Sequence, residues 1–201
     1  MTDKENIIFV DIDGPLLPAR QWYVPENSRI LQEVKGNTAE IQNSFELKKR
    51  IRFDPIAVAM FNTWVHFSKA KVVLSTNWVG HTSVPEILEL CLINGMDIML
   101  HTEPTTPKFL SSNRYREISS WVEDFSNYIN NFIVWDDDYT VHPDNLKNGD
   151  PNSKGNLFAE HVVRVDYNNG TSTENFKYGC NQLGIKERKV SAFLFGRDEI
   201  G

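Results

Sequence analysis

At 201 residues the chain is long enough for one sizeable core, and we expect a single domain over residues 1–201. Its formal net charge of −6 argues against non-specific clamping of a nucleic-acid backbone, although it leaves open the recognition of a nucleic-acid end. No apolar run approaches the roughly 20 residues that span a bilayer, and the first residues are polar, so we expect a cytoplasmic protein with no membrane partner.

The first predicted element is a strand over residues 7–10, because consecutive apolar residues indicate a strand that is buried on both faces. Asp11 and Asp13 follow it, and their side chains point the same way if the strand geometry persists. Gly14 then permits a turn that other residues resist. Two carboxylates this close repel each other unless a cation lies between them, which predicts a Mg²⁺ site; an ordinary Asp-Gly turn is the alternative.

Residues 18–52 show no clean periodicity and are expected to form an insertion between core elements. This insertion is either a lid or flap over the end of the first strand or an ordinary surface excursion. Its basic run, KKRIR at residues 48–52, is expected to be a solvated face, with a phosphate cradle as the alternative. Asp54 and Pro55 then predict the start of a helix with a broad apolar face.

Hydroxyl and amide side chains follow the second predicted strand. Residues 71–75, KVVLS, predict a buried strand, and Thr76 and Asn77 come directly after it. A helix over residues 86–93 and a third strand over residues 96–100 are expected next.

A second group of acids follows the fourth predicted strand. Helical spacing of apolar residues predicts a helix over residues 114–125. The apolar run at residues 132–135 then predicts a buried strand, which leads directly into Asp136, Asp137 and Asp138. Because these acids follow an apolar run without a break, we do not expect all three to be merely solvated charges.

The remainder of the chain contains fewer signals. Residues 139–160 predict a long loop that is either functional or mobile. Residues 161–165 predict a last core strand, and residues 171–183 a terminal helix. The tail at residues 189–195 fits an edge strand or an oligomer contact, and the sequence predicts no oligomeric state. The two cysteines have neither metal nor redox spacing and are expected to be free thiols.

Strands that alternate with helices predict an α/β fold with a doubly wound, mostly parallel, Rossmann-like sheet and helices on both faces. Such sheets bind ligands at the carboxyl ends of their strands. The acids and hydroxyls described above all follow predicted strands, so one edge of the sheet is expected to gather them into a single site.

The order of these motifs resembles the haloacid dehalogenase-like (HAD) superfamily of phosphohydrolases. The similarity extends to the branch found in phage and bacterial proteins and in some RNA-repair proteins. It covers residues 7–183 except 18–52, which then correspond to a small cap or flap insertion. The segments that carry it are IIFVDIDGPLL, STNWVGH, RYREISSWVEDF, FIVWDDD and VVRVDYNNGTS.

The resemblance implies roles for the acids in a Mg²⁺-dependent phosphatase. Asp11 would be the nucleophile that forms an aspartyl-phosphate. Asp13 would be the general acid for the leaving group and then the base for the hydrolytic water. Mg²⁺ would be held by Asp11, by the backbone carbonyl of Asp13, and by one or both of Asp136 and Asp137.

The resemblance also implies a hydroxyl and a cation that contact the phosphoryl group. Thr76 fits the hydroxyl, with Ser75 as the alternative. Arg114 fits the cation best, where the superfamily more often has Lys, and Arg116 and Lys108 are the alternatives.

Gly14, Asn77 and His81 are predicted to contact the substrate, while Trp78 is expected to pack in the core. The substrate implied is a phosphorylated small molecule, most simply a nucleotide, or a nucleic-acid end. The residues that would select it, in 18–52 and 139–160, follow no pattern that identifies it.

Two other functions use similar residues. A receiver-like phospho-aspartate switch also has acids at strand ends, but the late position of the triple Asp disfavours it. A non-catalytic binding module on the same fold would not need the full set of acids.

Overall fold

The computed structural model describes residues 4–109, 113–141, 159–186 and 189–190. Its strands form one five-stranded sheet in the order β3-β2-β1-β4-β5, and every neighbouring pair is parallel. The predicted α/β, Rossmann-like architecture is therefore confirmed. The strands are β1 (Glu5–Val10), β2 (Lys71–Leu74), β3 (Leu100–Thr105), β4 (Ile129–Asp136) and β5 (Val162–Arg164).

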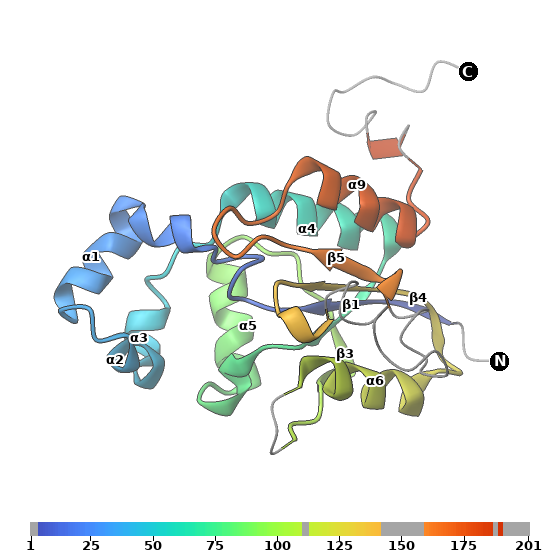
Figure 1. Ribbon diagram of the computed structural model, residues 1–201, viewed down its shortest axis with the longest axis horizontal. Helices are drawn as coiled ribbons and strands as arrows, with labels where there is room; N and C mark the ends of the chain where they lie inside the picture. Colours follow the sequence, from blue (N-terminus) through green and yellow to red (C-terminus); the bar gives the residue numbers. More distant parts are fainter. Residues whose placement is uncertain (1–3, 110–112, 142–158, 187–188, 191–201) are drawn as a thin grey trace.

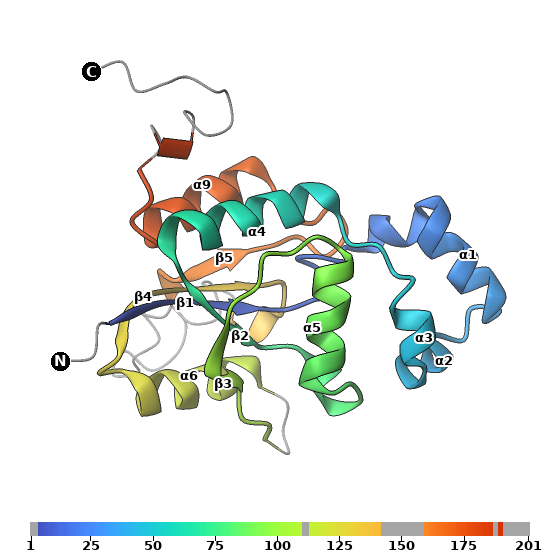
Figure 2. The ribbon, with the colours of Figure 1, turned by 180° about the vertical axis from the view of Figure 1, so that it is seen from behind.

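Helices cover both faces of this sheet, as predicted. Helices α4 and α9 lie on one face, and α6 lies on the other (Figures 1 and 2). Helix α4 begins where the sequence predicts, because the Asp54 side chain accepts a hydrogen bond from Ile56 N and Pro55 occupies the first turn. The principal helices are α4 (Pro55–Ser68), α5 (Val84–Ile93), α6 (Arg114–Phe125) and α9 (Thr173–Gln182).

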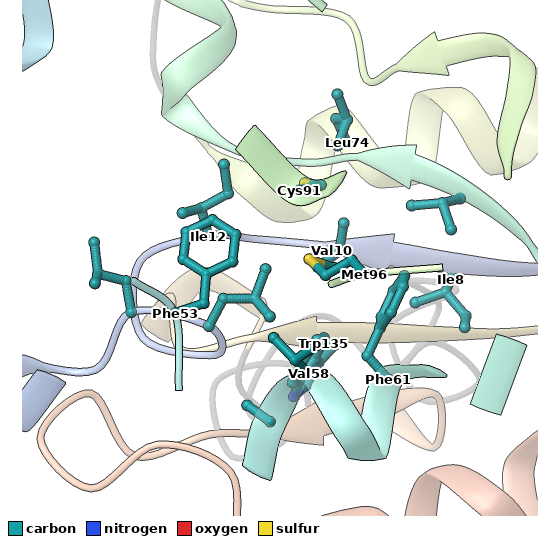
Figure 3. Close-up of a cluster of buried hydrophobic side chains, with 14 of the residues drawn as sticks. Ile8, Val10, Ile12, Phe53, Val58, Phe61, Leu74, Cys91, Met96 and Trp135 are labelled. Carbon is teal, nitrogen blue, oxygen red and sulfur yellow. The ribbon is translucent and has the colours of Figure 1, made fainter. Parts of the chain in front are cut away.

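Alternate residues of β1 face two separate apolar clusters. Ile8 and Val10 belong to the larger cluster, which includes residues of α4 and α5, and Figure 3 shows how they gather there. Ile7 and Phe9 belong to the second cluster, on the side of α6. Both faces of β1 are thus buried, which is why its sequence is a continuous apolar run.

The prediction of the third strand was wrong. It placed the strand at residues 96–100, whereas β3 begins at Leu100 and extends to Thr105. Strand β3 is at the edge of the sheet, so it tolerates Pro104 and exposed polar residues that a central strand would exclude. Met96, which suggested a strand, is instead buried in the connection that precedes β3.

The insertion at 18–52 is built from short helices that share the larger apolar cluster through buried residues such as Ile30 and Ile41. Its two ends are joined: Asn27 Nδ2 donates to Arg52 O at 2.8 Å, and Arg52 N donates to Asn27 Oδ1 at 2.7 Å. These helices lie together at one end of the molecule, beside α5 (Figures 1 and 2). They are a 3-10 helix (Ala19–Tyr23), α1 (Pro25–Glu33), α2 (Thr38–Asn43) and α3 (Phe45–Lys48).

The last predicted strand and the terminal helix are present as β5 and α9. Most of the predicted loop at 139–160 and of the tail at 189–195 lies outside the described residues. Within the described part of the chain, no helix has the length and apolar character needed to cross a bilayer. Cys91 and Cys180 are both buried, and, as expected, neither forms a disulfide with a described residue.

Candidate active site

The two groups of predicted acids meet at the carboxyl ends of β1 and β4. Asp11 directly follows β1, and its backbone N donates to Trp135 O at 3.1 Å, which brings it beside Asp136. Asp11, Asp136 and Asp137 each present a carboxylate oxygen, and these oxygens lie within 4.8 Å of one another. Strand β1 lies between β2 and β4, where the order of strands reverses, so this is the switch point at which such sheets bind ligands.

The donor set of this cluster fits a hard divalent cation such as Mg²⁺, which prefers oxygen ligands. One oxygen, Asp136 Oδ2, is buried and accepts no hydrogen bond from a described residue. Arg114 Nε, 3.2 Å away, supplies positive charge but no aligned hydrogen bond, so this buried oxygen is still unsatisfied as an acceptor. The three side chains Asp11, Asp136 and Asp137 could therefore hold a metal ion; Asp13 would add only its backbone carbonyl, which stays a prediction.

The pKa values of the cluster reflect burial and mutual repulsion. Burial raises the pKa of Asp11 from 3.8 to about 7, against the lowering effect of Arg114. Burial, and then the charge of Asp11, raise the pKa of Asp136 well above its ordinary value. Burial also raises the pKa of Asp137 to about 6. A bound dication would favour the charged form of all three carboxylates.

Arg114 is the cation that the structure places against these acids. It begins α6, where the Asn113 side chain caps the helix, and it is almost fully buried. Its Nη2 lies 3.5 Å from Asp11 Oδ2, and its Nε lies 3.2 Å from Asp136 Oδ2 as an ion pair without hydrogen-bond alignment. The alternative Arg116 is exposed on the same helix.

The other alternative, Lys108, contacts a residue that the sequence analysis missed. Lys108 Nζ donates to Glu117 Oε2 at 2.9 Å, and the same carboxylate lies 3.6 Å from Arg114 Nη1. Glu117 is buried between the two cations. Its position one turn after Arg114, in RYRE, is the only signal in the sequence that could have identified it.

Asp13 is held by a tryptophan. Trp78 Nε1 donates to Asp13 Oδ2 at 2.9 Å. Trp78 is buried, as expected, but this hydrogen bond was not foreseen, because it joins two segments far apart in the sequence. Burial raises the pKa of Asp13, and the Trp78 hydrogen bond acts in the opposite direction. Asp13 can therefore hold a proton at a higher pH than an exposed aspartate.

Thr76, rather than Ser75, contacts the acids. The Thr76 side chain accepts from Trp78 N at 3.3 Å, and its hydrogen bond to Asp11 lowers the pKa of that carboxyl. Ser75 Oγ is buried without a hydrogen-bond partner among the described residues. Geometry therefore favours Thr76 for the hydroxyl.

The predicted substrate contacts lie around the same edge, at different depths. Asn77 and His81 are exposed in the segment that follows β2. Gly14 is buried, has φ of +80°, and a Cβ there would lie 2.4 Å from Asp137 Cγ. Only glycine accommodates both conditions, so Gly14 allows Asp137 to approach the turn. Whether these three residues touch a substrate stays a prediction.

Comparison with known proteins agrees with this geometry. A family model described as the HAD domain in Swiss Army Knife RNA repair proteins matches residues 7–176, more than half of the chain. No curated protein and no solved structure matches the chain. Domains of the HAD type are generally hydrolases, and the predicted similarity to RNA-repair HAD domains is confirmed. The chain therefore belongs to the family of HAD domains found in Swiss Army Knife RNA repair proteins.

Proposed function

We propose that this protein is a Mg²⁺-dependent phosphomonoesterase that removes a terminal phosphate from a nucleic-acid end or a nucleotide. The observation that carries the proposal is the buried cluster of Asp11, Asp136 and Asp137 beside Arg114, at the switch point of a parallel sheet. Phosphoryl transfer needs a nucleophile, a proton donor and fixed positive charge, and this edge of the sheet offers all three.

In the first step Asp11 attacks phosphorus, and a bond forms between its carboxylate oxygen and the phosphoryl group. The bond from phosphorus to the leaving oxygen breaks, and Asp13 gives that oxygen its proton. The raised pKa of Asp13 suits a proton donor. Backbone N of Ile12 donates to Asp11 Oδ1 at 2.7 Å, which fixes the orientation of the nucleophile.

In the second step water attacks phosphorus, and Asp13, now ionised, accepts the proton of that water. The bond to Asp11 breaks, so the free carboxylate and inorganic phosphate are formed. Together the two steps convert a phosphomonoester and water into an alcohol and phosphate.

Three further groups have supporting roles. The Arg114 guanidinium supplies a fixed positive charge beside the nucleophile, and Thr76 supplies a hydroxyl next to it. Mg²⁺, when bound by Asp11, Asp136, Asp137 and the carbonyl of Asp13, would offset the negative charge of the carboxylates and the phosphate.

The proposed substrate class rests on the family description, which refers to RNA repair, and on the charge of the chain. A net charge of −6 suits contact with a nucleic-acid end better than with a long stretch of backbone. In this proposal the chain forms a single domain and the insertion at 18–52 acts as a cap beside the site.

The test is an assay of the purified protein with Mg²⁺ on p-nitrophenyl phosphate, a panel of nucleotides, and RNA oligonucleotides with a 5′ or 3′ terminal phosphate. We expect phosphate release that EDTA abolishes. Asp11→Asn should be inactive, whereas Asp124→Asn, which changes an exposed acid of α6, should retain full activity. Absence of hydrolysis with every substrate would refute the proposal, and full activity of Asp11→Asn would refute the assigned nucleophile.

A labelling experiment on the same purified protein distinguishes a phosphatase from a phospho-aspartate switch. After labelling with a radioactive phosphate donor, a phosphatase should lose the acyl-phosphate label rapidly. A label that persists for hours would favour the switch.

A further inference from the structure

Lys48 is a buried cation whose hydrogen-bond partners are all neutral. It ends helix α3 of the insertion, and only 2 % of its surface is exposed. Its Nζ donates to Thr82 Oγ1 at 2.5 Å and to His81 O at 3.3 Å. Among the described residues no carboxylate forms an ion pair with it, and the charge of Glu86, which opposes the lowering of its pKa by burial, acts without direct contact.

This arrangement costs free energy. A buried ammonium loses its hydration, and two neutral oxygens compensate only in part. Accordingly, burial lowers the pKa of Lys48. A methionine would fill a similar volume without that penalty, but it could not donate the hydrogen bonds to His81 O and Thr82 Oγ1. These hydrogen bonds join helix α3 of the insertion to the end of the segment of residues 78–82.

That segment leads directly to Asp13. Lys48 Nζ lies 5.9 Å from the centre of the Trp78 ring, within the range of a cation–π contact. At the other side of the same indole, Nε1 donates to Asp13 Oδ2 at 2.9 Å. Lys48 thus contacts both ends of the segment, at Trp78 and at Thr82, and Trp78 in turn contacts Asp13.

We propose that Lys48 is a positioning residue, supplied by the insertion, that keeps Trp78 hydrogen-bonded to Asp13. The proposal rests on the phosphatase function above, in which Asp13 protonates the leaving group. It makes the insertion a part of the catalytic apparatus, in addition to any role in the selection of substrate.

The dependence on the leaving group tests this role. The p-nitrophenolate ion is stable enough to leave without a proton, whereas the alkoxide of a nucleoside monophosphate needs one. We use kcat/KM, because it covers only the steps through formation of the aspartyl-phosphate. For Lys48→Met, kcat/KM with the nucleoside monophosphate should fall by about ten-fold, a modest part of what a general acid contributes. With p-nitrophenyl phosphate it should fall much less.

The neighbouring lysine provides a matched control. Lys49 Nζ pairs with Glu46 at 2.8 Å and with Glu89 at 3.8 Å, on the surface of the same helix end. Lys49→Met should leave both substrates unaffected. If Lys48→Met does not fold, Thr82→Val removes the hydroxyl acceptor at nearly constant volume and should give the same pattern to a smaller degree.

A double-mutant cycle with Trp78 supplies a second readout. If Lys48 acts through Trp78, Lys48→Met should cost little more in a Trp78→Phe background. Additive losses, equal losses with both substrates, or no loss with either would overturn the role of Lys48. A wild-type protein inactive on both substrates would instead refute the phosphatase function on which the role rests.

Discussion

Trp78 Nε1 donates a hydrogen bond of 2.9 Å to Asp13 Oδ2, and this is the only described side chain that holds the proposed general acid. The indole is buried, so it has little freedom to move away. Asp13 itself is half-buried, with its carboxylate fixed on one side by the indole. Trp78, which follows β2, thereby fixes the orientation of the carboxyl group that would transfer the proton.

We predict that Trp78→Phe lowers kcat by about ten-fold with a nucleotide substrate, because a misplaced proton donor loses part of its catalytic contribution. KM should change little, since the indole hydrogen bond is made within the protein. Trp121→Phe is the matched control: Trp121 is also buried, and its Nε1 donates to the backbone oxygen of Glu103 at 3.2 Å. Steady-state kinetics would contradict the prediction if the two variants lost activity equally.

A second prediction concerns Gly14. In Gly14→Ala the new Cβ would lie 2.4 Å from Asp137 Cγ, so Asp137 must move and the affinity for Mg²⁺ should fall by about ten-fold or more. The left-handed backbone should also lower the free energy of unfolding by about 1–2 kcal/mol.

Gly36→Ala separates these two effects. Gly36 has φ of +78°, but nothing lies within 4 Å of its added Cβ. It should therefore show the loss of stability without the loss of Mg²⁺ affinity. Calorimetric titration that gave equal Mg²⁺ affinities for the two variants would contradict the assignment of Asp137 as a ligand.

The central strands could be predicted because both their faces are covered. Burial on two sides makes β1, β2 and β4 apolar runs, and the acids that follow them are brought to one edge by parallel pairing. Strand β3 could not be predicted in this way, because an edge strand with the sequence LHTEPT has no apolar pattern. The insertion has only short helices with few buried residues, so its periodicity was also invisible.

Only the site residues that lie at the ends of strands could be predicted from the sequence pattern. Asp11 and Thr76 follow strands and Asp136 is the last residue of β4, and the structure brings the three together. The roles of Trp78, Glu117 and Lys48 depend instead on partners in other segments. Lys48 was expected to be solvated within a basic run, but it is buried and donates hydrogen bonds to Thr82 Oγ1 and His81 O.

The choice among the three candidate cations gives a third prediction. Arg114→Ala should lower kcat/KM by about 10²–10³-fold, because a fixed charge beside the transferring group is lost. Arg114→Lys should retain part of the activity, since it keeps the charge but not the planar geometry. Arg116→Ala removes an exposed residue of the same helix and should resemble the wild type. Equal losses for Arg114→Ala and Arg116→Ala would show that Arg114 is not the catalytic cation.

The last prediction concerns the stability of the metal-free protein as a function of pH. The pKa of Asp11 is raised from 3.8 to about 7 in the folded state. Between these pH values the unfolded chain releases the Asp11 proton while the folded protein keeps it, so this group lowers stability as pH rises from about 4 to about 7. Above the folded pKa, the penalty is complete. Asn at this position is neutral throughout, and the penalty should be absent.

In EDTA, therefore, the Tm of Asp11→Asn should exceed that of the wild type by an amount that grows from about pH 4 to about pH 7 and then levels off. Mg²⁺ at pH 8 should raise the Tm of the wild type much more than that of the variant, because the variant lacks one charged ligand. Thermal melts followed by circular dichroism measure both effects, with Asp124→Asn as the exposed control. A Tm difference independent of pH would contradict the raised pKa of Asp11, and equal stabilisation by Mg²⁺ would contradict its role as a ligand.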